Sequence, residues 1–214
     1  MKKNVFFVSG IDTGIGKSYV TGYLAREWNL SGIRTVTQKL VQTGNVDISE
    51  DIELHRCLMK TGLLPEDEER LTMPEIFTYP CSPHLAAEID HRPINLLRIA
   101  KATEELSMRY DAVLLEGAGG LMVPLKRNLL TIDYVAQCGY PLILVTSGRL
   151  GSINHTLLSL EAIKSRGIHL HSVVYNLFPK EEDRIIQEDT QNYIRCYLEE
   201  SFPEASFMVV PCLD

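Results

Sequence analysis

Short, continuous runs of apolar residues alternate along the chain with longer amphipathic stretches. The clearest runs cover residues 5–8, 112–115, 142–145, 173–175 and 207–210. Because these runs are apolar throughout, rather than at every second position, they predict strands that are buried on both faces. Residues 35–38 form a weaker candidate strand, which we place nearer the edge of the sheet.

Four stretches between the apolar runs have helical character. They cover residues 18–29, 95–109, 152–166 and 181–200. In the third, Ser152 is placed to cap the helix start and Gly167 follows its end. Strands that alternate with helices predict an α/β fold, with a doubly wound, mostly parallel sheet of about six strands and helices on both faces. For a chain of 214 residues we expect one domain spanning 1–214.

The region 44–94 is less regular than the rest and contains five prolines. It also carries the acidic run Glu66-Asp67-Glu68-Glu69. Runs of like charge usually lie in solvent, so we interpret this one as an exposed face and assign it no function.

The first apolar run leads directly into a glycine-rich segment. Residues 10–18 read Gly-Ile-Asp-Thr-Gly-Ile-Gly-Lys-Ser and precede a helical stretch. A strand, a glycine-rich turn ending in Gly-Lys-Ser and a helix form the context of a phosphate-binding loop, or P-loop. Lys17 would reach the β- and γ-phosphates of a nucleotide, and the Ser18 hydroxyl would bind Mg²⁺. Five residues separate Gly10 from Gly16, one more than the usual pattern has.

Other polar residues follow the predicted strands and should meet the P-loop at one edge of the sheet, because ligands bind beyond the carboxyl ends of parallel strands. Glu116 comes directly after the run 112–115, where P-loop proteins place a carboxylate for Mg²⁺. The glycines that follow it allow close approach of a ligand. Asn176 follows the run 173–175.

Three further positions leave two interpretations open. Lys39 is either a solvated surface charge or a second lysine that stabilises a transferring phosphoryl group. Asp51 is either a helix cap or a Mg²⁺ ligand. The helix start at 152–154 is either an ordinary capped helix or a site for a substrate carboxylate.

Composition narrows the classes of partner. The formal net charge is −7 and no run of Lys and Arg occurs, which argues against nucleic acid as the main partner. The five cysteines show neither zinc-site nor disulfide spacing, as expected for thiols in a reducing cytoplasm. No stretch approaches the roughly 20 apolar residues that a membrane-spanning helix needs.

Together these segments resemble the dethiobiotin synthetase family. Residues 10–18 resemble that family's extended P-loop, which carries the same additional residue. Further segments with this likeness are 38–44, 82–84, 116–120 and 150–155. The likeness runs from about residue 5 to the C-terminus, and the segments are specific in combination.

The resemblance implies a reaction and its reactants. One amine of 7,8-diaminononanoate takes up CO₂ to form a carbamate, ATP phosphorylates the carbamate, and the second amine closes the ureido ring of dethiobiotin. The resemblance also implies Mg²⁺ as cofactor, held by Ser18, Asp51 and Glu116, and Lys17 and Lys39 as the catalytic lysines.

The resemblance assigns further residues to the nucleotide and the substrate. The nucleotide would contact Thr13, Gly14, Ile15, Gly16, Lys17, Ser18, Tyr19, Asp51, Glu116, Gly117, Ala118, Gly119, Asn176, Pro211, Cys212 and Leu213. The diamine would contact Thr13, Lys39, Thr43, Ser152, Ile153 and Asn154. Members of the family are homodimers with the site near the subunit interface, and the helix start at Ser152 would serve the neighbouring subunit.

The sequence departs from the family pattern at Gly14, where many relatives have a larger side chain, and at Leu40, where proline is usual. Relatives also often continue beyond the segment around Pro211, which bears on how the base is enclosed.

Two other classes compete with a synthetase. Partitioning-type ATPases share the fold, but they carry an additional lysine early in the loop, where this chain has none. A glutamine-dependent amidotransferase would need a glutaminase domain, for which 214 residues leave no room.

Overall fold

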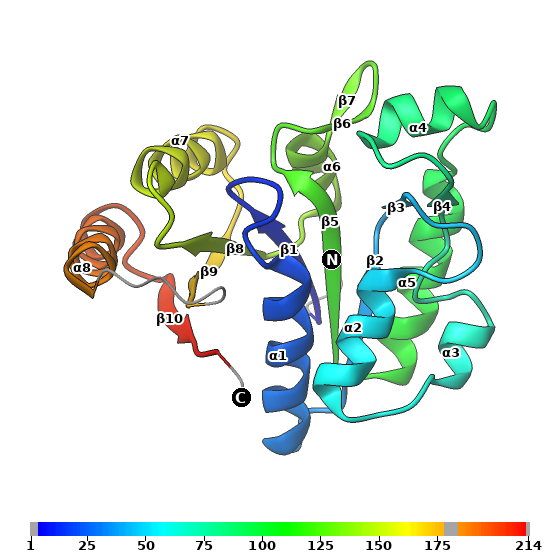
Figure 1. Cartoon of the computed structure of the whole chain (residues 1–214), viewed down its shortest axis with the longest axis horizontal. Coiled ribbons are helices and arrows are strands. Elements are labelled where there is room, and N and C mark those ends of the chain that lie inside the picture. The colour runs from blue at the N-terminus through cyan, green and yellow to red at the C-terminus, as the bar shows by residue number, and fades with distance from the viewer. Residues whose placement is uncertain (1–3, 178–183, 213–214) are drawn as a thin grey trace.

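Six parallel strands form the central sheet of the computed structural model, in the order β10-β9-β8-β1-β5-β2 (Figure 1). The structure describes residues 4–177 and 184–212. The strands are β1 (Val5–Gly10), β2 (Thr35–Lys39), β5 (Ala112–Gly120), β8 (Leu142–Ser147), β9 (Leu170–Asn176) and β10 (Ser206–Val210). Each apolar run is a strand, and β2 lies at the edge, so these predictions are confirmed.

Helices cover both faces of this sheet, which confirms the doubly wound architecture. One face packs against α1 (Lys17–Leu30) and the end of α2 (Glu50–Met59). In Figure 1 these two helices lie side by side in front of the strands. The other face packs against α5 (Leu96–Arg109), α6 (Thr131–Cys138), α7 (Ser152–Ser165) and α8 (Arg184–Ser201). Neighbouring strand residues such as Phe7 and Val8 belong to opposite cores, as the two-residue repeat of a strand requires.

Apart from α2, the irregular region and the two residues before it form short elements at one side of the sheet. They are β3 (Gln42–Thr43), α3 (Pro65–Glu68), β4 (Ile76–Phe77) and α4 (Pro83–Ile89), and a small hairpin of β6 (Pro124–Lys126) and β7 (Leu129–Leu130) lies near α4. The five cysteines are free, and two of them are exposed. Within 4–177 and 184–212, no helix combines the length and apolarity needed to cross a membrane.

The helix that begins at Ser152 is capped differently from our prediction. Gly151 occupies the cap position with a left-handed φ of 92°, and Ser152 is the first helical residue. The Ser152 hydroxyl is buried and lies 3.3 Å from the Ser147 hydroxyl. The prediction of Ser152 as the cap was therefore wrong, because a glycine in the left-handed conformation turns the chain into the helix one residue earlier.

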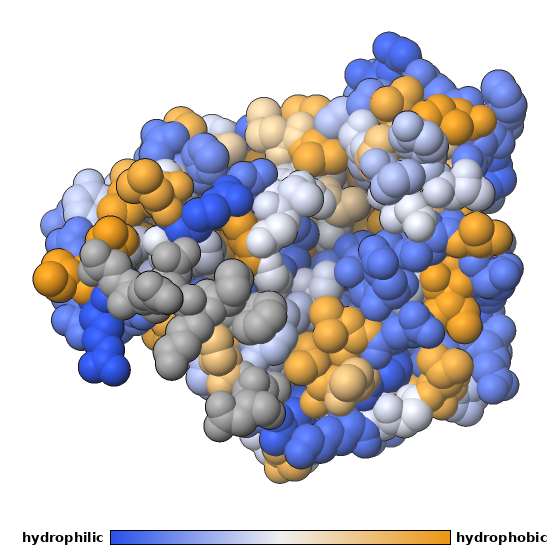
Figure 2. All heavy atoms as spheres, viewed as in Figure 1, coloured by the Kyte–Doolittle hydropathy of each residue, from blue (hydrophilic) through white to orange (hydrophobic). Residues whose placement is uncertain are grey.

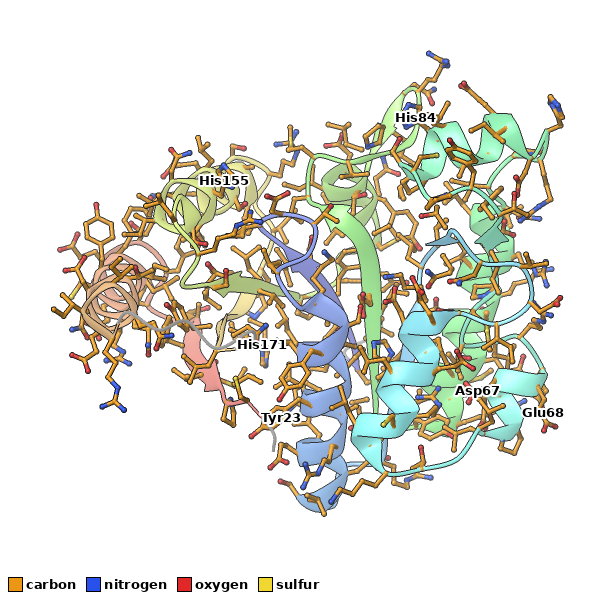
Figure 3. The ribbon with its side chains drawn as sticks, viewed as in Figure 1. Tyr23, Asp67, Glu68, His84, His155 and His171 are labelled. Atoms are coloured by element: carbon orange, nitrogen blue, oxygen red, sulfur yellow. The ribbon has the colours of Figure 1, made fainter. Side chains whose placement is uncertain are left out.

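The interpretation of the acidic run as wholly exposed was also wrong. Asp67 is buried and accepts hydrogen bonds from Arg56 Nε at 2.8 Å and Nη2 at 2.7 Å. The Thr72 hydroxyl and the Leu64 N–H also donate to it. Burial alone would raise the pKa of Asp67, but the bonds and charge of Arg56, together with the bonds from Thr72 and Leu64, outweigh that effect and lower it. Glu68, in contrast, lies on the outer side of α3 (Figure 3).

Candidate active site

The glycine-rich segment folds as a P-loop between β1 and α1. Gly16 ends the loop with a left-handed φ of 82°, which a side chain would strain. A Cβ added to Gly10 would lie 2.8 Å from Ile15 Cδ1 and 2.9 Å from Lys17 Cγ, so a side chain there would displace the side chains of the loop. Lys17 is buried, and its ammonium group donates to the Asp12 carbonyl at 3.0 Å. Burial lowers the pKa of Lys17, against the opposing effect of Glu116.

A cluster of oppositely charged side chains lies beside this loop. Lys39 Nζ lies 2.5 Å from Asp51 Oδ2 and 2.7 Å from Glu116 Oε1. The Ser18 hydroxyl lies 2.7 Å from Asp51 Oδ1 and 2.8 Å from Glu116 Oε1. Lys39 and Glu116 are buried, whereas the Asp51 side chain is about 20% exposed. Four residues from α1, α2, β2 and β5 thus converge at the carboxyl edge of the sheet.

The ionisation of this cluster follows from its pairing. Burial alone would raise the pKa of Glu116, but the Lys39 ammonium and the hydrogen bond from His55 lower it below the ordinary range. Burial alone would lower the pKa of Lys39, but Glu116 and Asp51 raise it. Glu116 and Lys39 are therefore both charged at neutral pH.

This geometry excludes one of the two interpretations for Asp51 and one for Lys39. Ser49, not Asp51, caps α2, because its hydroxyl accepts the Ile52 N–H at 3.2 Å. Asp51 instead points to Ser18 and Lys39. Lys39 is 4% exposed, so it is not a solvated surface charge.

His55 is a site residue that the sequence analysis missed. It lies on α2, is fully buried, and places its Nε2 2.8 Å from Glu116 Oε2. A signal for it existed in the sequence, since His55 is four residues after Asp51 and therefore on the same side of a helix. Without a known helix start and without Glu116 as its neighbour, that spacing alone did not indicate a role.

Two cavities meet at Thr13. The first, of about 430 Å³, is lined by the P-loop and by Lys39, Thr43, Asp51 and Glu116, and also by Ala118 and Gly119. Gly117 contributes its carbonyl oxygen, 3.3 Å from Lys39 Nζ. The second cavity, of about 460 Å³, is mostly apolar, and its lining includes Ile11, Met122, Val123, Leu158 and Ala162 as well as His155. His155 lies on α7, on the side of the molecule away from His84 (Figure 3). A charged compartment thus opens beside an apolar one.

The residues expected around the nucleotide base lie on the other side of the P-loop. The Asn176 amide donates to the Ile15 carbonyl at 3.0 Å, and the Tyr19 hydroxyl donates to the Pro211 carbonyl at 2.8 Å. Cys212 Sγ lies 3.0 Å from the Leu177 carbonyl oxygen. Leu213 lies outside the described residues.

The helix start at Ser152 does not join these groups. Ser152, Ile153 and Asn154 line neither of the two cavities that meet at Thr13. Asn154 is exposed and Ile153 is half-buried. The first turn of α7 has no side-chain cap, so its N–H groups are not satisfied in that way.

The parallel sheet, the P-loop at the end of β1 and the acidic Glu116 in the middle of the neighbouring β5 define a P-loop NTPase. Solved structures agree on the fold. The MinC:MinD cell division complex of Aquifex aeolicus matches with a TM-score of 0.58 and 13% identity, covering 97% of this chain and 81% of the other. A ParA family ATPase of Chlorobium tepidum matches with a TM-score of 0.54 and 15% identity, covering 99% and 86%.

Sequence comparisons identify the family within this class. The model of a family described as AAA domain matches residues 4–201. The ATP-dependent dethiobiotin synthetase BioD 2 of Pasteurella multocida is 48% identical over 96% of both chains. The BioD enzyme of Chlorobaculum tepidum is 52% identical over 86% of this chain and 77% of its own. The chain belongs to the dethiobiotin synthetase family, which confirms the resemblance.

Proposed function

We propose that this protein is an ATP-dependent ligase that converts 7,8-diaminononanoate and CO₂ to dethiobiotin in biotin biosynthesis. The observation that carries the proposal is the identity of 48% with a dethiobiotin synthetase along nearly the whole of both chains. The convergence of Lys17, Lys39, Asp51 and Glu116 on one cavity supports it, because this is the set that phosphoryl transfer needs.

The P-loop would bind the triphosphate of ATP through its backbone N–H groups and Lys17. Ser18, Asp51 and Glu116 would hold Mg²⁺, which neutralises phosphate charge during transfer. The donor set fits this ion, since it consists of oxygens only. Within the described residues no group of three or more His, Cys, Asp or Glu could hold a metal alone. This also suits Mg²⁺, which usually completes its coordination with phosphate and water.

The chemistry brings two anions together. An amine attacks CO₂ and loses a proton to give a carbamate, whose oxygen then attacks the γ-phosphorus of ATP and releases ADP. The second amine attacks the carbonyl carbon of this mixed anhydride, and phosphate leaves as the ring closes. Lys17 and Lys39 offset the repulsion between carbamate and γ-phosphate and the charge that develops in transfer. Ring closure then depends mainly on positioning.

We place the diamine across the two cavities. Thr13 and Thr43 would bind its amine or carbamate end beside the phosphates, and the apolar cavity next to Thr13 would receive its alkyl chain. The base of ATP would lie near Asn176 and Pro211, which flank the P-loop on its other side.

We further propose a homodimer in which the first turn of α7 binds the substrate carboxylate of the neighbouring subunit. Unsatisfied N–H groups at a helix start favour such an anion. Leu150, Leu158 and Met122 are 93%, 62% and 53% exposed around this region, which suits a covered surface. Figure 2 shows apolar atoms over α7 and over the connection that follows β5. We place the enzyme in the cytoplasm, without nucleic-acid or membrane partners.

A product assay tests the proposed function. Purified protein is incubated with ATP, Mg²⁺, bicarbonate and 7,8-diaminononanoate, and dethiobiotin is measured by mass spectrometry, with GTP and CTP in parallel. We expect nucleotide turnover only when the diamine and CO₂ are both present. Strong ATPase activity that the diamine does not change, without dethiobiotin, would instead favour a nucleotide switch of the partitioning type.

A further inference from the structure

We propose that His55 is a positioning residue that orients Glu116 for metal binding and so sets the affinity of the site for the divalent cation. The inference rests on the proposed function, because it assumes that Glu116 binds the metal that accompanies ATP. It concerns a side chain that itself contacts neither of the two cavities.

The two oxygens of Glu116 have different partners. Oε1 faces the cavity side of the cluster, with Lys39 Nζ at 2.7 Å and the Ser18 hydroxyl at 2.8 Å. Oε2 faces away from them and lies 2.8 Å from His55 Nε2. Because Glu116 is fully buried, water cannot replace a lost donor at Oε2. The imidazole thus fixes the rotation of the carboxylate that presents Oε1 to the site.

The imidazole is in turn held from behind. His55 Nδ1 lies 3.0 Å from the Thr37 hydroxyl, and Arg56 Nη1 donates to the same hydroxyl at 2.8 Å. Since Arg56 can only donate, the Thr37 hydrogen is available for Nδ1, which leaves the ring proton on Nε2 to be donated to Glu116. Two bonds to Asp67 fix Arg56. A continuous chain of hydrogen bonds therefore connects Asp67, through α2 and β2, to the carboxylate of the site.

Partners that orient metal ligands from behind affect affinity strongly, and their loss typically costs about 10–100-fold. Substitution His55→Leu removes the donor and replaces the imidazole with an apolar side chain of similar size. His55→Gln keeps a donor, because the amide nitrogen of Gln can reach the position of Nε2. Ile52→Val is the matched control, since Ile52 is a buried residue of the same helix.

The experiment measures Mn²⁺ binding by electron paramagnetic resonance in the complex with a non-hydrolysable ATP analogue, which requires no turnover. We expect H55L to weaken Mn²⁺ binding about 10–100-fold, while the analogue alone binds as to the wild type. H55Q should restore most of the affinity and I52V should retain it. In the product assay, H55L should raise the Mg²⁺ concentration needed for half-maximal rate.

Unchanged Mn²⁺ affinity in H55L would overturn the role of His55, even if dethiobiotin is formed normally. Equal losses in H55L and H55Q would also overturn it, because packing rather than donation would then matter. If H55L does not fold, Thr37→Val is measured instead. We expect it to lose less Mn²⁺ affinity than is expected of H55L, and an unchanged affinity would contradict the proposal. A wild type that binds Mn²⁺ but makes no dethiobiotin would refute the proposed function and leave the metal-binding comparison intact.

Discussion

Two buried clusters lie on opposite sides of helix α2, and each contains both positively and negatively charged side chains. They differ in how completely hydrogen bonds satisfy the charged groups. On one side, Arg56 and Asp67 form a bidentate pair with distances of 2.8 and 2.7 Å, and Thr72 and Leu64 donate further bonds to Asp67. On the other side, Lys39 is shared between Asp51 and Glu116, and the cluster opens into a cavity.

This difference distinguishes a buried ion pair that stabilises the fold from one that is suited to a role in catalysis. Arg56 and Asp67 bind each other through two hydrogen bonds, and neighbouring groups donate further bonds to Asp67. A ligand therefore has no contact in this closed cluster that it could replace. Lys39 carries a flexible ammonium held by two carboxylates beside a cavity, where the phosphates and metal ion that we propose would take over its contacts. Both clusters are buried and charged, so burial alone does not identify an active site.

The largest expected effect is on the open cluster. Lys39→Ala should reduce dethiobiotin formation by about 10²–10³-fold, because it removes positive charge aimed at the transferring phosphoryl group. ATP should still bind, since the P-loop is intact. Rates are measured by product formation and ATP binding by calorimetry, with the exposed Lys101→Ala as control. Near-normal turnover in K39A would exclude Lys39 from the mechanism.

The closed cluster should matter for folding instead. Arg56→Leu leaves Asp67 buried without its main partner and should lower the free energy of unfolding by about 3–5 kcal/mol, as measured in urea. The double variant R56L/D67L should recover much of this loss, because no uncompensated charge remains. If the double variant is no more stable than R56L, packing rather than charge sets the cost.

The closed cluster should also give stability a distinct pH dependence. The pKa of Asp67 in the folded protein lies below its ordinary value of 3.8, so the unfolded chain binds more protons in acid. Its contribution is complete above pH 3.8 and is lost as the pH falls from there through the folded pKa. The wild type should therefore lose stability more steeply than Asp67→Asn below that pH, as followed by urea unfolding. Parallel curves for the two proteins would contradict this.

The smallest effect is expected at an exposed pair of the same geometry. Arg34 binds Asp111 with distances of 3.0 and 2.8 Å, but the two side chains are 68% and 47% exposed. Because water and salt screen such a pair, Arg34→Met should leave the urea midpoint nearly unchanged. A loss comparable to that of R56L would show that bidentate geometry, and not burial, governs the strength of these pairs.

Many features of the site could be predicted from the sequence because the patterns that indicate them are local. Continuous apolar runs mark strands buried on both faces, and the P-loop is one contiguous segment whose glycines and Lys17 act together. Lys39 and Glu116 could be placed near it, since parallel strands end at the same edge. The interpretation of the acidic run as an exposed face was wrong because its members have different surroundings. Asp67 on α3 binds Arg56 on α2, and no local pattern predicts that contact.

The amino-acid order alone thus specified the α/β sheet, the phosphate-binding loop and the family, since each depends on residues that are neighbours along the chain or repeat at a regular interval. Folding in three dimensions was needed to show that Asp51 is no cap, that Gly151 rather than Ser152 caps α7, and that His55 contacts Glu116. That last contact joins residues 61 positions apart. Its strength depends on distance and burial, which arise only when α2 packs against the sheet.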